Sequence, residues 1–371
     1  MKKTGIFIFS LLLSFCLLSN LKVNSQQDLG SFRLSNVEPY YNSYFQPFGR
    51  SIAVSMGGGW YNTANTHKLL GVDISLIAIS GTLIPDVDKV FFASSLELED
   101  NLRLNSDPDD IPTLSAKKGD GTVPTLQMRY THPITNEVEY QDMFPLSGGQ
   151  GLGAGMAPNM LQIGIGLPKE TDLKIRFIPT FSIPFIKLDE VSLWGLGVQH
   201  DLKQWIPFVN KVPILQLSAV VAYSKFSASY SGKPFPITPE LFSASVDAGT
   251  YPTSTWDGQS FGIEASSFVG DVVFGLKIPV FQPYISLGFN KAKFSGGLRG
   301  SYPSITLRQD GTNVGNVVTG IDEDPINIES NDLMFNAAAG FRLKLAVITF
   351  FGQYTIQKYP MVTGGLGISI R

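Results

Sequence analysis

The chain has 371 residues, and only 16% of them are charged, against roughly 25% in ordinary soluble domains. Its formal net charge of -3 argues against nucleic acid as a partner, because a binder needs a basic stripe to offset phosphate. The single cysteine, Cys16, lies near the start, so the rest of the chain forms no disulfide and no thiolate metal site.

The first residues have the features of a secretory signal peptide. Lys2 and Lys3 precede an apolar run from Ile6 to Leu18, and a polar stretch then leads to Ser25, a small residue suited to cleavage. The chain after Ser25 contains no apolar run of about 18 residues, so no transmembrane helix is predicted. We therefore expect residues 1–25 to be removed from an exported protein.

Residues 26–50 have the spacing of a short helix. Ser35 and Glu38 form a capping-box pair, and Pro47 is expected to end the helix. Aromatic residues recur three and four positions apart, and these are the plug candidates Tyr40, Tyr41, Tyr44, Phe45 and Phe48. Two placements stay open: a helix packed at the periplasmic mouth of the barrel predicted below, or a plug in its lumen.

Residues 51–371 contain about twelve segments in which apolar and polar residues alternate, as on a strand with one apolar face. In chain order they lie near 52–60, 70–78, 89–99, 161–167, 173–177, 194–198, 215–223, 268–276, 281–289, 332–344, 348–357 and 362–371. Their polar faces are rich in Gly, Ser, Thr, Asn and Gln, which is typical of a crowded lumen. Strands of about ten residues suit a tilted membrane crossing.

Long connections near 100–158, 229–256 and 295–330 alternate with short turns near Pro168, Lys277 and Leu345. Outer-membrane barrels have short turns on the periplasmic side and long loops outside, and all six connections fit that rule. A hairpin within 123–144 is too short to span unaided. The predicted fold is an all-β transmembrane antiparallel barrel of about 12 strands, or about 14 if that hairpin spans.

Three stretches carry a resemblance to a known family: GGGWYNTANTHKLLG at 57–71, GLGVQHDLKQWIP at 195–207 and GGLGISIR at 364–371. They resemble an uncharacterised family of bacterial outer-membrane barrels, which is similar in outline to the long-chain fatty-acid and hydrophobic-compound transporters. The resemblance implies a barrel in the outer membrane of a Gram-negative bacterium and carries no known substrate. At that location we expect contact with membrane lipid, lipopolysaccharide and the barrel-assembly machinery.

Charged residues on the predicted strands are expected to face the lumen, because an Arg or Lys facing lipid at the midplane would cost about 2 to 4 kcal/mol. The lumen candidates are Asp73, Lys174, Arg176, Asp271, Arg342 and Lys344. They form either a selectivity ladder or ion pairs that rigidify the wall. Four aromatic residues near predicted strand ends suit the membrane interfaces: Trp60, Trp194, Tyr354 and Tyr359.

The chain is not expected to be an enzyme. A hydrolase of this kind needs a serine and a histidine with an orienting polar group. The three histidines lie in a predicted external loop (His67), in the long excursion (His132) and near a predicted periplasmic turn (His200), and structural or interfacial roles are expected for each. No cofactor and no metal site is predicted, since the acidic runs at 107–110 and 322–324 have no regular ligand spacing.

Two functions of different classes stay open. The first is a channel or transporter that admits a small solute, apolar solutes included, through a lumen narrowed by the aromatic N-terminal segment. The second is a closed barrel whose external loops bind a partner or surface lipid without flux.

Overall fold

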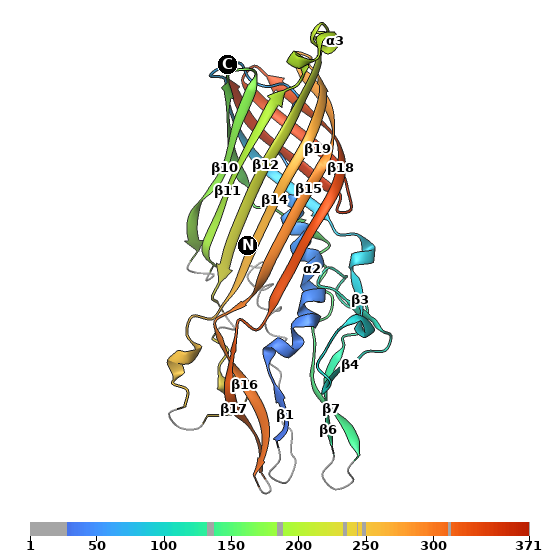
Figure 1. The fold of residues 1–371 in the computed structure, drawn as a ribbon, viewed down its shortest axis with the longest axis vertical. Coiled ribbons are helices and arrows are strands. Elements are labelled where there is room, and N and C mark those ends of the chain that lie inside the picture. Colours follow the sequence, from blue (N-terminus) through green and yellow to red (C-terminus); the bar gives the residue numbers. More distant parts are fainter. Residues whose placement is uncertain are drawn as a thin grey trace.

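The computed structural model describes residues 28–370, with gaps at 132–136, 184–187, 233–235, 243, 247–249 and 311–312. The predicted signal peptide, Cys16 and His132 lie outside the described residues. The molecule is an elongated barrel with smaller sheets extending from one end (Figure 1).

In the described part of the chain, ten antiparallel strands close into a barrel, because the last strand pairs with the first. They are β2 (Val72–Leu83), β9 (Met160–Leu167), β10 (Thr171–Ile183), β11 (Leu188–Asp201), β12 (Leu215–Tyr230), β14 (Ser260–Leu276), β15 (Phe281–Arg299), β18 (Asn327–Leu345), β19 (Ile348–Ile356) and β20 (Met361–Ile370). The short strand β8 (Ala154–Met156) adds to the far part of β2.

The alternation of side chains explains the barrel. On β15, Leu287 is 68% exposed on the outer wall, whereas its neighbour Ser286 is buried inside. On β18, Phe335 is 79% exposed and Met334 is buried. An apolar exterior and a polar, filled interior are the properties of a transmembrane barrel, in which closure leaves no backbone group unpaired at an edge.

The sequence predicts the fold class correctly but gives too many strands. The predicted strand at 52–60 is instead the end of helix α2 (Glu38–Ser55) and an irregular segment. The one predicted at 89–99 contains only β3 (Val90–Phe92), next to the 3-10 turns η2 (Asp86–Asp88) and η3 (Ala93–Ser95). Alternation over a few residues does not separate a strand from a small-residue helix end. The other ten predicted strands are confirmed.

The count of about 14 strands is also wrong, because the hairpin of β6 (Thr125–Thr131) and β7 (Val138–Pro145) stays outside the barrel. It pairs with β4 (Leu102–Asn105) in a separate three-stranded sheet. A further short pair joins β3 to β5 (Asp110–Pro112).

The two ends of the barrel differ. The turns at 168–170, 277–280 and 346–347 define the short-turn end, which also has η5 (Lys203–Trp205) and α3 (Pro207–Asn210). The connections at 84–159, 231–259 and 300–326 define the long-loop end. There, β16 (Ser301–Asp310) and β17 (Asn313–Glu323) form a hairpin that pairs with β1 (Asp28–Phe32) and β13 (Ala244–Ser245). The turns η6 (Pro239–Phe242) and η7 (Thr253–Trp256) complete this end.

After β1, the chain enters the barrel from the long-loop end. After η1 (Leu34–Val37), helix α2 follows β18: the Glu38 carboxylate accepts a bond from the backbone N–H of Asn327, and Arg50 pairs with Asp332. Figure 1 shows α2 beside the lower part of β18. Residues 56–71 continue through the lumen and join β2 at the short-turn end. We call residues 38–71 the inner segment.

Helix α2 continues through Pro47, which was expected to end it, and reaches Ser55. A proline removes one helical hydrogen bond, but here the buried faces of Tyr44 and Val54 on either side keep the helix packed. No helix in the described ranges is long and apolar enough to cross a membrane.

Candidate functional site

The lumen is filled by residues 53–67 of the inner segment, and glycines allow this chain to lie close to the wall. A Cβ on Gly58 would lie 2.2 Å from Ser80 Oγ and 2.6 Å from Thr363 Oγ1. Gly59 has a φ of +75°, which favours glycine. The sequence therefore places three small residues, Gly57–Gly59, where helix α2 ends and the chain turns into the lumen.

Side chains of the barrel wall hold this part of the inner segment by donating hydrogen bonds to its backbone carbonyl oxygens. The bonds are Asn290 Nδ2 to Val54 (3.0 Å), Ser80 Oγ to Ser55 (2.6 Å), Ser224 Oγ to Met56 (3.2 Å), Arg176 Nη1 to Met56 (3.3 Å), Lys174 Nζ to Trp60 (2.9 Å) and Gln199 Nε2 to Thr63 (2.9 Å). The six donors come from five different strands, since Lys174 and Arg176 both lie on β10. The wall thus surrounds the segment with donors.

Arg176 is fully buried and lies over the ring of Trp60, with 3.9 Å between the guanidinium carbon and the ring centroid. Its Nε donates to Gln162 Oε1 at 2.9 Å. Trp60 itself is buried, and a Cβ on Gly197 of the wall would lie 2.8 Å from its ring. The prediction that Trp60 lies at the membrane interface is wrong, because the residue belongs to the inner segment and not to a strand.

A second cation lies closer to the short-turn end. Arg342 donates from Nη1 to Asn62 Oδ1 and from Nη2 to Asp73 Oδ2, both at 3.0 Å. Ser75 also donates to Asp73, at 2.6 Å. Arg342 therefore joins the wall strands β18 and β2 to the inner segment.

The remaining lumen candidates lie on the inner face or near it. Lys174 is buried and also donates to Gln199 Oε1 at 2.6 Å, and Asp271 is buried on β14. Lys344 shares the face of Arg342 on β18 but is half-buried near the turn. The structure thus brings five of the six charges into the interior and places the sixth at its rim.

Of the two histidines in the described residues, His67 lies elsewhere than the sequence suggests, whereas His200 lies near a turn of the short-turn end, as predicted. His67, expected in an external loop, lies inside the short-turn end, where its Nδ1 is 2.9 Å from Asp172 Oδ2. His200 contacts Thr171 Oγ1 at 2.8 Å and accepts a bond from Trp205 Nε1 at 3.0 Å. Among the described residues, no cluster of three His, Cys, Asp or Glu side chains is arranged to hold a metal ion.

The plug candidates lie at the long-loop end, beyond the lumen residues. Tyr40 and Tyr44 stack at 5.7 Å between ring centroids, and their hydroxyls donate to the carbonyl oxygens of Ser147 and Gly148. Phe45 lies 6.3 Å from Phe261, centroid to centroid. Tyr41 is buried in the same cluster, whereas Phe48 is half-buried.

The aromatic helix is therefore not at the mouth beside the short turns, where one prediction placed it. The residues that fill the lumen, 53–67, were assigned to a strand and a loop. The Gly57–Gly59 run was the one sequence signal for them, because three glycines in a row allow close contact with a wall.

Arg50 connects α2 to three parts of the long-loop end. Its Nε donates to Asp332 Oδ2 at 2.6 Å, and its Nη1 lies 3.3 Å from Tyr359 Oη and 3.6 Å from Asp88 Oδ2. Tyr359 donates to Asp88 and is buried, and burial raises the pKa of its hydroxyl. The prediction of Tyr359 as an interface aromatic is wrong, since it lies in a turn and points inward.

The other two predicted interface aromatics lie on the outer wall. Trp194 is 53% exposed on β11 and lies 5.5 Å from the ring of Tyr223, and Tyr354 is 48% exposed on β19. Their outward position fits the membrane-interface role proposed for them.

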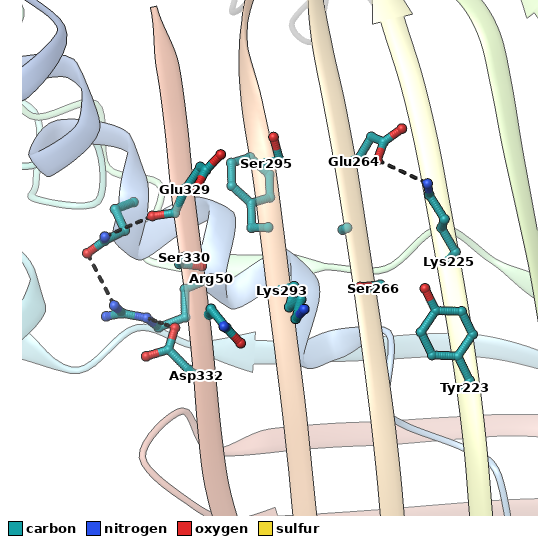
Figure 2. A pocket seen from close by; sticks show the side chains of 14 residues that line it. Arg50, Tyr223, Lys225, Glu264, Ser266, Lys293, Ser295, Glu329, Ser330 and Asp332 are labelled. Atoms are coloured by element: carbon teal, nitrogen blue, oxygen red, sulfur yellow. Dashed lines mark hydrogen bonds and ion pairs between the residues drawn. The ribbon is translucent and has the colours of Figure 1, made fainter.

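A groove of about 520 Å³ lies at the long-loop end, beside α2 and strands β12, β14, β15 and β18 (Figure 2). Its lining carries three cations and three carboxylates, which are Arg50, Lys225, Lys293, Glu264, Glu329 and Asp332. Lys225 pairs with Glu264 at 3.0 Å. The balanced charges give the groove no preference for one sign of ligand.

Comparison with solved structures finds other barrels at low identity. The translocator domain of autotransporter NalP from Neisseria meningitidis is 9% identical (TM-score 0.26; 86% of this chain and 92% of that chain covered). The outer-membrane protease OmpT from Escherichia coli is 10% identical (TM-score 0.28; 84% and 99%). The toluene transporter TbuX from Ralstonia pickettii is 9% identical (TM-score 0.25; 90% and 99%). No curated protein matches the chain in sequence.

One of these results corrects a prediction. The prediction that the chain is not an enzyme is contradicted, because the solved structures found include the outer-membrane protease OmpT. The likeness assigns no activity to this chain.

The family comparison covers nearly the whole sequence. One family model matches residues 1–370, and its description is a family of unknown function, DUF6588. The closed strand order described above independently gives the chain the architecture of outer-membrane barrels. The chain therefore belongs to the family of unknown function DUF6588.

Proposed function

We propose that this protein is an outer-membrane transporter for a small solute, and that its inner segment is a movable plug. The signal peptide at 1–25 directs export and is cleaved there. The observation that carries the proposal is the set of hydrogen bonds from wall side chains to the carbonyl oxygens of residues 54–63. Such bonds depend little on the plug's own side chains.

Polar contacts of this kind exchange with water at moderate cost. A typical hydrogen bond contributes only about 0.5–1.5 kcal/mol net, since water replaces the lost partner. When the plug moves, the donors of the wall become a hydrated lumen surface. A plug held by a large apolar interface would expose that surface to water and would be held more firmly.

An apolar strip in the lumen supports an apolar solute. Trp60, Tyr61 and Ala64 of the inner segment cover a group of wall residues. That group is Val220, Ala222, Val269, Val273 and Tyr284. When the plug moves, this strip faces the lumen beside the polar donors, so a solute with an apolar body and a polar end would find partners for both.

A disulfide lock tests the proposal. Ser51 on α2 and Thr82 on β2 contact each other through their hydroxyls, and both are buried. The double variant Ser51→Cys, Thr82→Cys fixes the plug at residue 51, while the chain itself fixes it at β2. Trp60→Ala in the same protein loosens the plug between these points.

We expect current steps in planar bilayers for the Trp60→Ala variant. The triple variant that also carries Ser51→Cys and Thr82→Cys should conduct no current when its disulfide is oxidised, and should show steps again after reduction. Each single cysteine variant is the matched control and should behave as its parent. Silence in every folded variant would overturn the proposal and would favour the closed barrel that binds a partner with its external loops. Steps that persist in the oxidised lock would also contradict it.

A further inference from the structure

Three side chains at the short-turn end are arranged in the order of a serine hydrolase triad. His67 Nδ1 lies 2.9 Å from Asp172 Oδ2, and His67 Nε2 lies 3.4 Å from Ser369 Oγ. The three residues come from the inner segment, β10 and β20, so that only the closed barrel with its inner segment in place brings them together.

Asp172 fixes the orientation of the histidine ring at two points. Its Oδ1 accepts a bond from the backbone N–H of His67 at 2.9 Å, while Oδ2 faces the ring nitrogen Nδ1. A carboxylate at Nδ1 requires the proton on that nitrogen, which leaves the lone pair of Nε2 directed at the Ser369 hydroxyl. Ser369 is then placed as the nucleophile, His67 as the base and Asp172 as the orienting carboxylate. The 3.4 Å between Ser369 Oγ and His67 Nε2 is a common distance before substrate binds.

A spare hydrogen-bond donor lies beside this group. Ser369 stands directly opposite Asp73 in the β20–β2 pairing, which places their Cβ atoms about 4.5–5.5 Å apart. Asp73 holds the guanidinium of Arg342, whose buried Nε has no hydrogen-bond partner in the described structure. This N–H group is available to a negative oxygen that develops near Ser369.

The site can be reached from the short-turn end. The His67 side chain is 13% exposed, and Lys68, Leu69 and Leu70 after it are exposed at the mouth. Ser369 is buried. Because the side chains of His67 and Ser369 are both little exposed, we expect only small carboxylic esters to reach the serine.

We propose that Ser369, His67 and Asp172 form a hydrolytic site for small carboxylic esters, a function separate from transport. Ser369 Oγ bonds to the ester carbonyl carbon while His67 Nε2 takes its proton, and Arg342 Nε–H stabilises the oxyanion. The bond to the leaving alkoxide breaks, and His67 returns the proton to it. Water then attacks the acyl-serine with His67 as base, releasing the carboxylic acid and restoring Ser369.

An alkyl fluorophosphonate tests this directly on the folded full-length barrel in detergent, since an activated serine displaces fluoride and keeps the phosphonyl group. We expect a stoichiometric adduct that peptide mass spectrometry places on Ser369, and hydrolysis of p-nitrophenyl acetate that Ser369→Ala abolishes. Asp172→Asn should lower both rates at least about 100-fold, because an amide favours the wrong tautomer.

Ser218→Ala is the matched control, because Ser218 is a lumen-facing serine of β12 that contacts Gln199 and no histidine. It should be labelled like the wild type. A difference in electrophoretic mobility between unheated and heated samples verifies that each variant is folded. The inference is overturned if folded wild type gains no adduct at Ser369, or if His67→Gln is labelled there at the wild-type rate. Bilayer currents decide the transport proposal separately, since Ser369→Ala removes the contact to His67 but leaves the hydrogen bonds to the carbonyl oxygens of residues 54–63 intact.

Discussion

The two halves of the inner segment are held in different ways. In α2, Tyr40, Tyr41 and Tyr44 are buried in an apolar cluster, and Arg50 forms ion pairs at its edge. In residues 56–67, three side chains pack on a smaller apolar group of the wall, and wall side chains donate hydrogen bonds to backbone oxygens along the segment. Apolar packing loses its free energy when water enters, whereas water replaces polar partners. The first half is therefore an anchor, which the disulfide between positions 51 and 82 would make permanent, and the second half is the part that moves first.

The largest effect should come from Arg176→Met. This change removes the cation over Trp60, leaves Gln162 Oε1 without this donor, and leaves the Met56 carbonyl with Ser224 alone. We expect the free energy of unfolding to fall by about 2–4 kcal/mol, from a lost buried charge-assisted bond and a lost cation–π contact. Denaturant titration followed by tryptophan fluorescence measures it.

Arg103→Met is the matched control, because the guanidinium carbon of Arg103 lies 3.3 Å from the ring centroid of Tyr140 in the separate sheet of β4, β6 and β7, outside the lumen. It should leave the lumen unchanged. An equal loss of unfolding free energy in the two variants, with Trp60 still buried in both, would mean that the contacts of Arg176 do not hold residues 56–67 against the wall.

Gly58→Ala tests the close approach of the moving half. The added methyl would lie 2.2 Å from Ser80 Oγ and 2.6 Å from Thr363 Oγ1, so we expect a loss of about 1–3 kcal/mol and an open lumen. Gly153→Ala, with no atom within 4 Å of the added Cβ, should change nothing. Thermal shift and bilayer current measure the two effects. If Gly58→Ala changes neither the melting temperature nor the current, residue 58 lies farther from the wall than described here.

The ion pair of the anchor should matter less. Arg50 and Asp332 are partly exposed, so solvent screens them, and a double-mutant cycle of Arg50→Gln with Asp332→Asn should give a coupling of about 1 kcal/mol or less. Denaturant titration of the four proteins yields the coupling. A value of several kcal/mol would show that ion pairing, and not aromatic packing, holds α2.

The smallest effect is expected at Lys225 and Glu264 on the outer wall. Both side chains are well exposed, and Lys225→Gln should alter stability by no more than about 0.5 kcal/mol. The same titration measures this, and a larger loss would mean that the groove residues support the barrel.

Much of the barrel is predictable because its strands repeat one physical rule over many residues. Leu333, Phe335 and Phe341 face outward, and Arg342 faces inward, as the period of two requires. The same parity rule places Lys174 and Arg176 inside, where lipid cannot contact them.

The inner segment is not predictable in this way. Ile52, Val54 and Met56 alternate with small residues, yet they belong to a helix end, because the wall around them supplies the contacts that decide the structure. Trp60 and Tyr359 have the composition of interface residues, but long-range partners, Arg176 and Asp88, bury them. Likewise, Ser369 meets His67 only through closure of the barrel, which no local pattern encodes.

The most direct measurement of the central comparison is amide hydrogen–deuterium exchange of the folded protein in detergent, read by mass spectrometry. We expect residues 57–66 to exchange far faster than residues 44–54 of α2, and Arg176→Met to accelerate the exchange of residues 57–66 only. Equal, slow exchange throughout residues 44–66, unchanged in Arg176→Met, would show a rigid inner segment and would contradict the movable plug.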